Sequence, residues 1–369
     1  MKIVDVNPFY YPYKGGIERR MHDTAARLAA RGHDVTILTG KLSPDSPAEE
    51  KTEGFRIVRL DSRLLRIYNP PFISSKGVGE ALESLDPDVV NFNYRWAPSY
   101  SKDLRRYDGA KVFTYHNMWG EGTGLVGAIS KFNDSRFSKT LETFDHIIAV
   151  SDAVRDDLIR RGYPEKYVTT VPTCLTGGID PGKGDGDFIL SLGRLVKTKG
   201  LDVLMEAMKD VDHRLVVCGS GPEEKRLRKL ISKYGLEDRV EMKGYVTDEE
   251  RTALMGSCRF FVMPSLFESL GLAAEELMSR GRPVVCSDAN GLPETVGKAG
   301  VVVPKGDAKA LADAMNALYD DGERCNELAE AAVERAKFYD WDNHLPVIED
   351  IYAKAAAGEL TEADGRSES

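Results

Sequence analysis

Short segments rich in β-branched residues alternate with amphipathic helical segments along almost the whole sequence. The strands predicted for the first series are Lys2–Val6, Asp34–Thr39, Phe55–Leu60, Asp88–Phe92, Ala110–His116, His146–Val150 and Tyr167–Val171. The helices predicted between several of them are Ile17–Ala30, Gly77–Leu85 and Asp152–Arg161. Strands that alternate with helices form parallel sheets covered on both faces, so the pattern predicts an α/β fold.

The alternation stops at a Gly- and Asp-rich stretch and then starts again. Residues 173–187 cannot bury an apolar face, so they are predicted to form an interdomain linker. The strands predicted after it are Phe188–Leu192, Arg214–Cys218, Val240–Met242, Phe260–Met263, Pro283–Cys286 and Val301–Val303, with Pro222–Tyr234 as the clearest helix.

The two series predict two Rossmann-like domains, over residues 1–172 and 188–343. Ligands of open α/β sheets bind at the carboxyl ends of the strands, so we expect the domains to face each other across a cleft. A C-terminal helix over 344–357 is expected to pack back toward the first domain. The acidic tail over 358–369 is predicted to be disordered.

Composition narrows the classes of protein. The length of 369 residues is typical of two domains, and the net charge of −9 argues against nucleic-acid binding. No run approaches the roughly 18 apolar residues that span a bilayer, and the N-terminus lacks the apolar core of a signal peptide. We therefore expect a soluble, cytoplasmic protein. Its five cysteines form no Cys-x-x-Cys pair and are expected to be buried, reduced thiols.

Two loops that follow strands carry residues suited to phosphate. Gly15 and Gly16 precede the first helix, where the backbone can approach an anion closely. Arg194, Lys197 and Lys199 follow the first strand of the second domain, and such cations suit a diphosphate. A plain helix-start turn and a solvated basic loop are the respective alternatives.

Two glutamates follow the predicted strand Phe260–Met263. Glu268 lies on the loop at the carboxyl end of that strand, and Glu276 lies one to two turns into the next helix. Eight helical residues span about 12 Å, so the pair can contact two parts of one ligand but not a single scissile bond. His116 ends a strand of the first domain, where a histidine can polarise a substrate. A buried structural histidine is the alternative.

Metal-ligand patterns are weak in this sequence. The Asp-x-Asp pairs are Asp86 with Asp88, Asp185 with Asp187, Asp210 with Asp212, and Asp340 with Asp342. Three of these pairs precede strands instead of following them, so we expect no metal site.

Several motifs occur in an order that one enzyme family shares. They are Gly15-Gly16-Ile17-Glu18, Leu28-Ala29-Ala30-Arg31-Gly32-His33-Asp34-Val35-Thr36, Ala149-Val150-Ser151, Gly193-Arg194-Leu195 with Lys199-Gly200, Gly219-Ser220-Gly221-Pro222, Gly244-Tyr245-Val246, and Glu268 to Glu276 with Gly281 and Pro283. Together they resemble the retaining glycosyltransferases of family 4, which have the GT-B fold and an E-x7-E motif. The resemblance covers the chain from Gly15 to Trp341.

The resemblance implies transfer of a hexose from a nucleotide diphosphate sugar to a glycan, lipid or small-molecule acceptor, with no metal and no other cofactor. Arg194 and Lys199 would hold the diphosphate and Glu276 the ribose hydroxyls. Glu268 would hold the donor sugar, and His116 would lie beside the transferred hexose. Further contacts to the donor are expected from the backbone of Gly15, Gly16, Gly244, Tyr245, Val246, Ser269, Leu270, Gly271 and Leu272.

Departures from the family pattern leave alternatives open. Pro172 is followed by Thr173-Cys174-Leu175, where the family has Pro-Asn-Gly-Val-Asp, and this alters the hinge. Asn290-Gly291 replaces the usual Gly-Gly of a later loop. A nucleotide-sugar epimerase or hydrolase of the same fold and a non-catalytic nucleotide-sugar-binding subunit are the competing functions. Residues 63–72 mix basic and apolar side chains, which suits either peripheral membrane contact or an ordinary loop. The donor base, sugar, acceptor and oligomeric state stay open.

Overall fold

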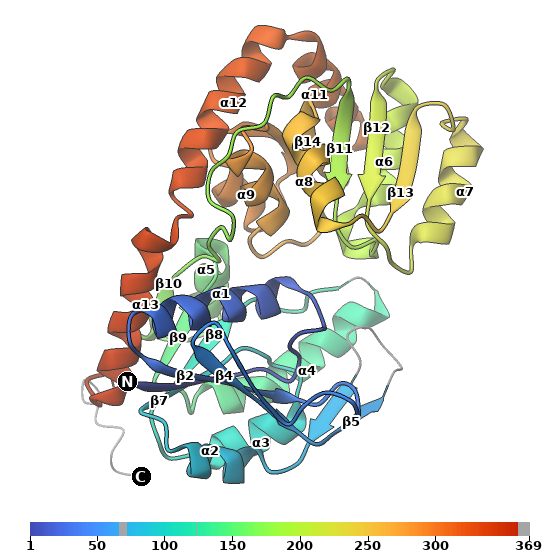
Figure 1. Cartoon of the computed structure of the whole chain (residues 1–369). Coiled ribbons are helices and arrows are strands. Elements are labelled where there is room, and N and C mark those ends of the chain that lie inside the picture. Colours follow the sequence, from blue (N-terminus) through green and yellow to red (C-terminus); the bar gives the residue numbers. More distant parts are fainter. Residues whose placement is uncertain (66–71, 123, 361–369) are drawn as a thin grey trace. The chain divides into compact units, whose positions relative to one another are not determined.

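The computed structural model describes residues 1–65, 72–122 and 124–360, which form two compact units. Unit 1 contains residues 1–120 and 128–172 together with the C-terminal residues from 342 onward, and unit 2 contains residues 121–127 and 173–341. Each unit has its own mainly parallel sheet with helices beside it (Figure 1). The predicted α/β class is therefore confirmed.

Unit 1 is built on an eight-stranded sheet in the order β10-β9-β8-β7-β1-β2-β4-β3. Its strands are β1 (Lys2–Val6), β2 (Asp34–Gly40), β3 (Glu49–Thr52), β4 (Phe55–Leu60), β7 (Val89–Phe92), β8 (Lys111–Tyr115), β9 (His146–Ala149) and β10 (Val168–Thr170). Its helices are α1 (Gly16–Ala30), α2 (Val78–Leu85), α3 (Pro98–Arg106), α4 (Leu125–Leu141), α5 (Asp152–Arg160) and the 3₁₀ turn η1 (Glu165–Tyr167). The strands from β10 to β4 pair in parallel, as strand–helix alternation predicts.

Three strands of unit 1 have no clear signal in the sequence. β3 has a polar sequence with no buried side chain, and it forms because its backbone pairs antiparallel with β4. β5 (Ser62–Leu65) pairs antiparallel with β6 (Phe72–Ser75) in a separate small sheet. The segment 63–72, considered above for membrane contact, begins and ends in this pair, and its residues 66–71 lie outside the described residues.

Unit 2 contains a six-stranded parallel sheet in the order β13-β12-β11-β14-β15-β16, the strand order of a Rossmann fold. Its strands are β11 (Phe188–Leu192), β12 (Arg214–Cys218), β13 (Val240–Gly244), β14 (Phe260–Met263), β15 (Val284–Ser287) and β16 (Gly300–Val303). Its helices are η2 (Lys197–Lys199), α6 (Leu201–Ala207), η3 (Met208–Asp210), α7 (Glu224–Tyr234), α8 (Asp248–Ser257), α9 (Leu272–Ser279), α10 (Leu292–Val296), α11 (Ala308–Asp320) and α12 (Gly322–Lys337). A core of buried Leu, Val, Ile and Met side chains joins the sheet to α6, α7 and α11.

The chain between the two sheets, residues 173–187, contains no helix or strand. Gly182 and Gly186 donate backbone hydrogen bonds to Arg280 and Ser257 at 3.0 and 2.8 Å, so part of this segment is fixed within unit 2. The last helix, α13 (Trp341–Ala356), belongs to unit 1 from residue 342 onward. Of the tail predicted to be disordered, residues 361–369 lie outside the described residues. Among the helices described, none is long and apolar enough to cross a membrane.

Candidate active site

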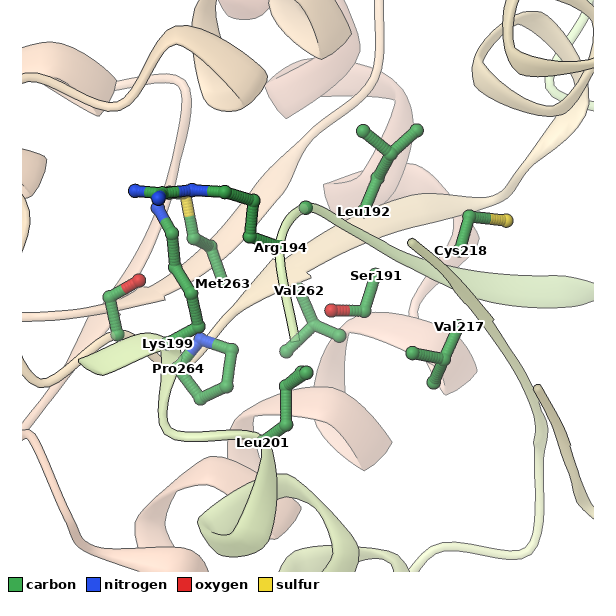
Figure 2. Close-up of a pocket in the computed structure, with 12 residues that line it drawn as sticks. Ser191, Leu192, Arg194, Lys199, Leu201, Val217, Cys218, Val262, Met263 and Pro264 are labelled. Atoms are coloured by element: carbon green, nitrogen blue, oxygen red, sulfur yellow. The ribbon is translucent and has the colours of Figure 1, made fainter. Parts of the chain in front are cut away.

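A pocket of unit 2 lies where a doubly wound sheet is expected to bind ligands. In such a sheet the connections leave the two central strands toward opposite faces, which opens a crevice at the carboxyl ends of those strands. Here the two strands are β11 and β14, which pair in parallel. The pocket at this point (Figure 2) is lined by Ser191, Leu192, Gly193, Arg194, Lys199, Leu201, Val217, Cys218, Val262, Met263, Pro264 and Ser265.

Two glycines let the loops around this pocket approach each other. Gly219 follows β12 with a φ of 137°, and a Cβ atom there would lie 1.8 Å from the carbonyl oxygen of Gly193. Gly200 precedes α6 with a φ of 62°, and a Cβ atom there would lie 2.0 Å from the carbonyl oxygen of Pro264. Both positions therefore need glycine for backbone conformation and for space.

Arg194 and Lys199 bring two cations to this pocket. Both side chains extend from the loop that joins β11 to α6, and they reach toward the same side of the pocket (Figure 2). Arg194 is exposed, whereas the side chain of Lys199 is 23% exposed. The N–H group of Leu195 donates to the carbonyl oxygen of Ser220 at 2.9 Å, which holds the loop against the segment after β12. The side chains of Arg194 and Lys199 can together bind an anion that carries two negative charges.

Glu268 lies beside Lys199 and forms an ion pair with it. The two residues meet because the N–H groups of Leu266 and Phe267 donate to the carbonyl oxygen of Thr198 at 2.7 and 3.2 Å. The carbonyl oxygen of Glu268 also accepts a hydrogen bond from the backbone of the loop before α10. A carboxylate and an ammonium group are thus held together at the carboxyl end of β14.

Glu276 is paired with a residue that the sequence motifs do not predict. Its carboxylate forms an ion pair with Arg251 of α8. Helix α8 begins with a capping box, in which Thr247 Oγ1 accepts from the Glu250 N–H at 3.2 Å and Glu250 Oε2 accepts from the Thr247 N–H at 2.9 Å. The Thr-x-x-Glu pattern is a sequence signal for the start of this helix, and the start places Arg251 in its first turns. No local sequence pattern of this kind predicts that Arg251 pairs with Glu276.

The predicted base-binding segment, Gly244 to Val246, begins at the last residue of β13. Gly244 has a φ of 74°, and its carbonyl oxygen accepts from the N–H group of Gly219 at 2.7 Å. This bond ties the segment to the turn after β12. Tyr245 is 72% exposed, so its ring is open to solvent in this structure.

The predicted sugar-binding amides lie at the start of α9. Ser269, Leu270 and Gly271 form the turn before the helix, and Leu272 is its first residue. Gly271 is the N-cap residue with a φ of 111°, and Glu268 directly precedes this turn. The N-terminal end of a helix favours negative or acceptor groups, which agrees with the role that the resemblance implies.

The other predicted site residues belong to unit 1. His116 follows β8, and its Nε2 atom lies 3.1 Å from Asn93 Oδ1. Burial, together with the nearby charge of Arg20, lowers the pKa of His116 well below its usual value, which keeps the imidazole neutral. Gly15 is the N-cap residue of α1 and Gly16 is the first residue of that helix.

A group of buried polar residues in unit 1 is absent from the motif-based prediction. Asp5, Asn91 and Asn93 are almost fully buried at or near the carboxyl ends of β1 and β7. The sequence contains a weak signal for them, since Asp5 and Asn91 interrupt otherwise apolar strands.

The residue types that bind metals, Asp, Glu, His and Cys, are the possible ligands in this sequence. Within residues 1–65, 72–122 and 124–360, no group of three or more His, Cys, Asp or Glu residues could hold a metal ion. In the Asp86–Asp88 pair, the side chains contact Lys2 at 3.8 and 2.7 Å, at the amino ends of β1 and β7. The five cysteines are buried and form no disulfide bond, as predicted. Burial raises the pKa of Cys218, which lines the pocket of unit 2, to about 11.

Two family models match the chain in succession. The model described as Glycosyltransferase Family 4 matches residues 14–176, and the model described as Glycosyl transferases group 1 matches residues 180–335. The first match covers most of the first predicted domain, and the second covers most of the other.

Curated relatives align with the chain over nearly its whole length. A phosphatidyl-myo-inositol mannosyltransferase of Mycobacterium leprae is 28% identical, and the alignment covers 96% of this chain and 97% of the relative. A glycogen synthase of Mycobacterium tuberculosis is 27% identical, and that alignment covers 97% of this chain and 96% of the relative.

Solved structures share the fold. A sucrose-phosphate synthase of Thermosynechococcus elongatus superposes with a TM-score of 0.82 at 22% identity, covering 97% of this chain and 99% of that one. Anabaena HepE, solved in complex with UDP and glucose, superposes with a TM-score of 0.77 at 19% identity, covering 96% of this chain and 100% of the other. These likenesses confirm the fold class that the motif resemblance implies.

Proposed function

The chain belongs to the family 4 glycosyltransferases of the GT-B fold, and on this premise we propose that it transfers a hexose from a nucleotide diphosphate sugar to a glycan, lipid or small-molecule acceptor, with retention of anomeric configuration. The observation that carries the proposal is the cluster of Arg194, Lys199 and Glu268 at the carboxyl ends of β11 and β14. The donor side of the reaction is assigned to unit 2.

The two cations suit the diphosphate of the donor. The guanidinium group of Arg194 offers several N–H donors in a planar fork, and the Lys199 ammonium group is a mobile point charge. In this structure Lys199 is paired with Glu268. When the diphosphate takes up Lys199, the carboxylate of Glu268 is released to accept hydrogen bonds from hydroxyl groups of the hexose. Glu276, paired with Arg251, is assigned to the ribose hydroxyls.

The chemistry of the proposed reaction explains why cations are needed. Cleavage of the bond between the anomeric carbon and the phosphate oxygen leaves positive charge on the sugar and negative charge on the diphosphate. Fixed cations lower the barrier because they stabilise the charge that develops on the leaving group. The acceptor hydroxyl attacks the same face of the sugar, and its proton passes to an oxygen of the departing diphosphate. The configuration at the anomeric carbon is thereby retained.

Peripheral membrane contact is part of the proposal for lipid acceptors. Ile129 and Phe132 lie one turn apart on α4 and are 53% and 62% exposed. Lys131 and Arg136 are exposed on the same helix, and the Arg136 guanidinium lies 5.9 Å from the centre of the Phe132 ring. Apolar side chains flanked by cations suit an anionic bilayer surface. Sedimentation with anionic and with neutral vesicles tests this contact. The double variant I129S/F132S should sediment with anionic vesicles less than the unmodified protein does. Equal sedimentation of the double variant and the unmodified protein would contradict the contact.

An epimerase or hydrolase of the same fold is the second candidate, because its donor site would contain the same groups. The two functions differ in their need for an acceptor. Incubation of the protein with a nucleotide sugar alone distinguishes them, since an epimerase or hydrolase gives stoichiometric isomerisation or free sugar without an acceptor.

Two substitutions test the assignment of the donor site. Glu268→Gln should reduce transfer by about 10²-fold or more but leave nucleotide diphosphate affinity nearly unchanged, because this residue is assigned to the sugar. Lys199→Ala should weaken nucleotide diphosphate binding itself by roughly tenfold, because it removes one charged hydrogen bond. Isothermal titration calorimetry with UDP, GDP and ADP measures the nucleotide affinity of both variants, and release of nucleotide measures transfer.

Lys197→Ala is the matched control for the lysine variant. Lys197 lies two residues from Lys199 in the same 3₁₀ turn, is exposed, and does not line the pocket. Full activity of both the Glu268 and Lys199 variants, or an equal loss in the Lys197 control, would show that the site is assigned to the wrong residues.

A further inference from the structure

A series of buried and partly buried hydrogen bonds leads from Asp5 to His116 in unit 1. Asp5 lies in β1 and is in register with Asn91 of β7, and Asn93 follows the end of β7. The exposed fractions of Asp5, Asn91 and Asn93 are 5%, 3% and 3%. A buried polar group without a partner costs several kcal/mol, so the hydrogen bonds determine how each side chain is oriented.

Asp5 fixes the orientation of the two asparagine side chains. Its Oδ1 atom accepts hydrogen bonds from Asn93 Nδ2 at 2.6 Å and from Asn91 Nδ2 at 2.9 Å. An ionised carboxylate can only accept, so both amides turn their NH₂ groups toward it. The Thr114 hydroxyl donates to Asn91 Oδ1 at 2.8 Å, which agrees with this orientation.

The oriented Asn93 in turn fixes the proton of His116. Asn93 Oδ1 points away from the carboxylate and lies 3.1 Å from His116 Nε2. An amide oxygen can only accept, so the Nε2 atom must carry the hydrogen. The neutral ring then presents Nδ1 as an unprotonated acceptor. The guanidinium group of Arg20 is the charged group that bears most directly on this ring, and its charge opposes a second proton.

We propose that Asp5 and Asn93 are positioning residues that hold His116 as its Nε2–H tautomer, so that Nδ1 accepts a hydrogen bond from a hydroxyl group of the transferred hexose. This inference rests on the proposed function and on the position beside the transferred hexose that the family resemblance implies for His116. A purely structural role, in which the cluster only joins β1 to β7, predicts no dependence of the His116 tautomer on Asp5.

The tautomer can be read directly by NMR, without donor, acceptor or activity. The protein is labelled with ¹⁵N-histidine, and the Nδ1 and Nε2 shifts are recorded at about pH 7.5, where Asp5 is ionised. We expect the His116 shifts of a single Nε2–H tautomer. An Nδ1–H tautomer, a mixture of the two or an imidazolium in the unmodified protein overturns the proposal.

Substitution of Asp5 tests whether the carboxylate is the cause. Asp5→Asn has the same shape, but its amide can donate as well as accept, so only the Val6 carbonyl oxygen, which accepts from Asn93 Nδ2 at 3.3 Å, still opposes a turn of the Asn93 NH₂ group toward His116. We expect His116 to become a mixture of tautomers in this variant. Asn93→Ala removes the acceptor itself and should have the same effect, which keeps the test available if the Asp5 variant fails to fold.

Thr114→Val is the matched control, because it removes a hydrogen bond from the same cluster without touching Asp5, Asn93 or His116. Its His116 shifts should match those of the unmodified protein. His146 serves as an internal reference, since its Nε2 atom contacts Thr169 and should not respond to Asp5→Asn. A tautomer change in the Thr114 control, or none in Asp5→Asn, overturns the proposal.

Addition of a nucleotide sugar separates this inference from the proposed function. The probe is whichever of UDP-glucose, GDP-mannose and ADP-glucose binds most tightly. It should shift His116 Nδ1, whereas the corresponding nucleotide diphosphate without the hexose should not. Asp5→Asn should lower kcat by roughly tenfold or more with an unchanged Kd for the nucleotide diphosphate. Binding of the nucleotide sugar without a shift at Nδ1 overturns the hexose contact but leaves the donor site in unit 2 intact.

Discussion

Asp5 shows how a single buried residue makes stability depend on pH. Burial raises the pKa of Asp5 to about 6, although hydrogen bonds from Asn91 and Asn93 act in the opposite direction. In the unfolded chain an aspartate has a pKa near 4. Between these two values the folded chain holds a proton that the unfolded chain has released. The free energy of unfolding therefore falls as pH rises from about 4 to about 6, on the order of 3 kcal/mol, and levels off above pH 6.

Asp5→Asn should remove this contribution. Urea unfolding of both proteins at a series of pH values gives the difference in unfolding free energy, which should move in favour of the variant as pH rises from about 4 to 6. His146 acts in the opposite direction, because burial lowers its pKa to about 4 and stability is lost as pH falls. That contribution is common to both proteins and cancels in the difference. A difference independent of pH would contradict the prediction.

The motifs predict residues that lie at strand ends, but not the partners that those residues acquire. Arg194, Lys199 and Glu268 are visible in the sequence because each follows a predicted strand, and the structure brings the latter two into contact. Arg251 has no local signal of this kind, and Asn93 follows the predicted strand Asp88–Phe92 but belongs to none of the motifs. Their roles depend on contacts with residues far away in the sequence, which the local pattern does not encode.

At the scale of helices and strands, two glycines with the same backbone conformation should respond differently to substitution. Gly200 and Gly235 have φ values of 62° and 65°, and both flank helices. Alanine in this left-handed conformation costs about 1–2 kcal/mol at either position. A Cβ atom on Gly200 would also collide with the carbonyl oxygen of Pro264, whereas nothing lies within 4 Å of one on Gly235.

Gly200→Ala should therefore destabilise the protein by about 1–3 kcal/mol more than Gly235→Ala does. It should also weaken nucleotide diphosphate binding, because the loops that carry Lys199 and Glu268 must separate to admit the new methyl group. Urea denaturation and calorimetric titration measure the two effects. Equal destabilisation of the two variants would show that the contact between these loops is not tight in solution.

Several strands with a strong apolar pattern are predicted with the correct bounds. The predicted bounds of β1, β4, β11, β12 and β14 agree with the structure, because mainly apolar runs, or in β4 an alternation of buried and half-buried residues, leave few alternatives. β3 escapes prediction since its four residues are polar and it depends wholly on pairing with β4. A short edge strand is specified by its neighbour more than by its own side chains.

At the scale of the whole molecule, the two units have different chemistry. Unit 2 holds the cations and carboxylates assigned to the donor, and unit 1 holds the neutral His116 with its buried hydrogen-bond network. The chain as a whole has a net charge of −9, so Arg194 and Lys199 are positive groups in an acidic protein. Arg194 and Lys199 therefore attract a dianionic ligand to the pocket of unit 2. Salt should weaken binding of this ligand, because salt screens exposed charges.

The same distribution of charge predicts that transfer needs no divalent metal. In metal-dependent transferases a cation such as Mn²⁺ neutralises the departing diphosphate, whereas here Arg194 and Lys199 are assigned that role. Transfer measured after exhaustive treatment with a chelator should stay within about twofold of the untreated rate, since protein cations cost no reorganisation during the reaction. Lys199→Ala provides the internal control, because added Mn²⁺ should partly restore activity in that variant but not raise the activity of the unmodified enzyme. Loss of activity with the chelator and its return with Mn²⁺ in the unmodified enzyme would mean that the two cations do not neutralise the leaving group by themselves.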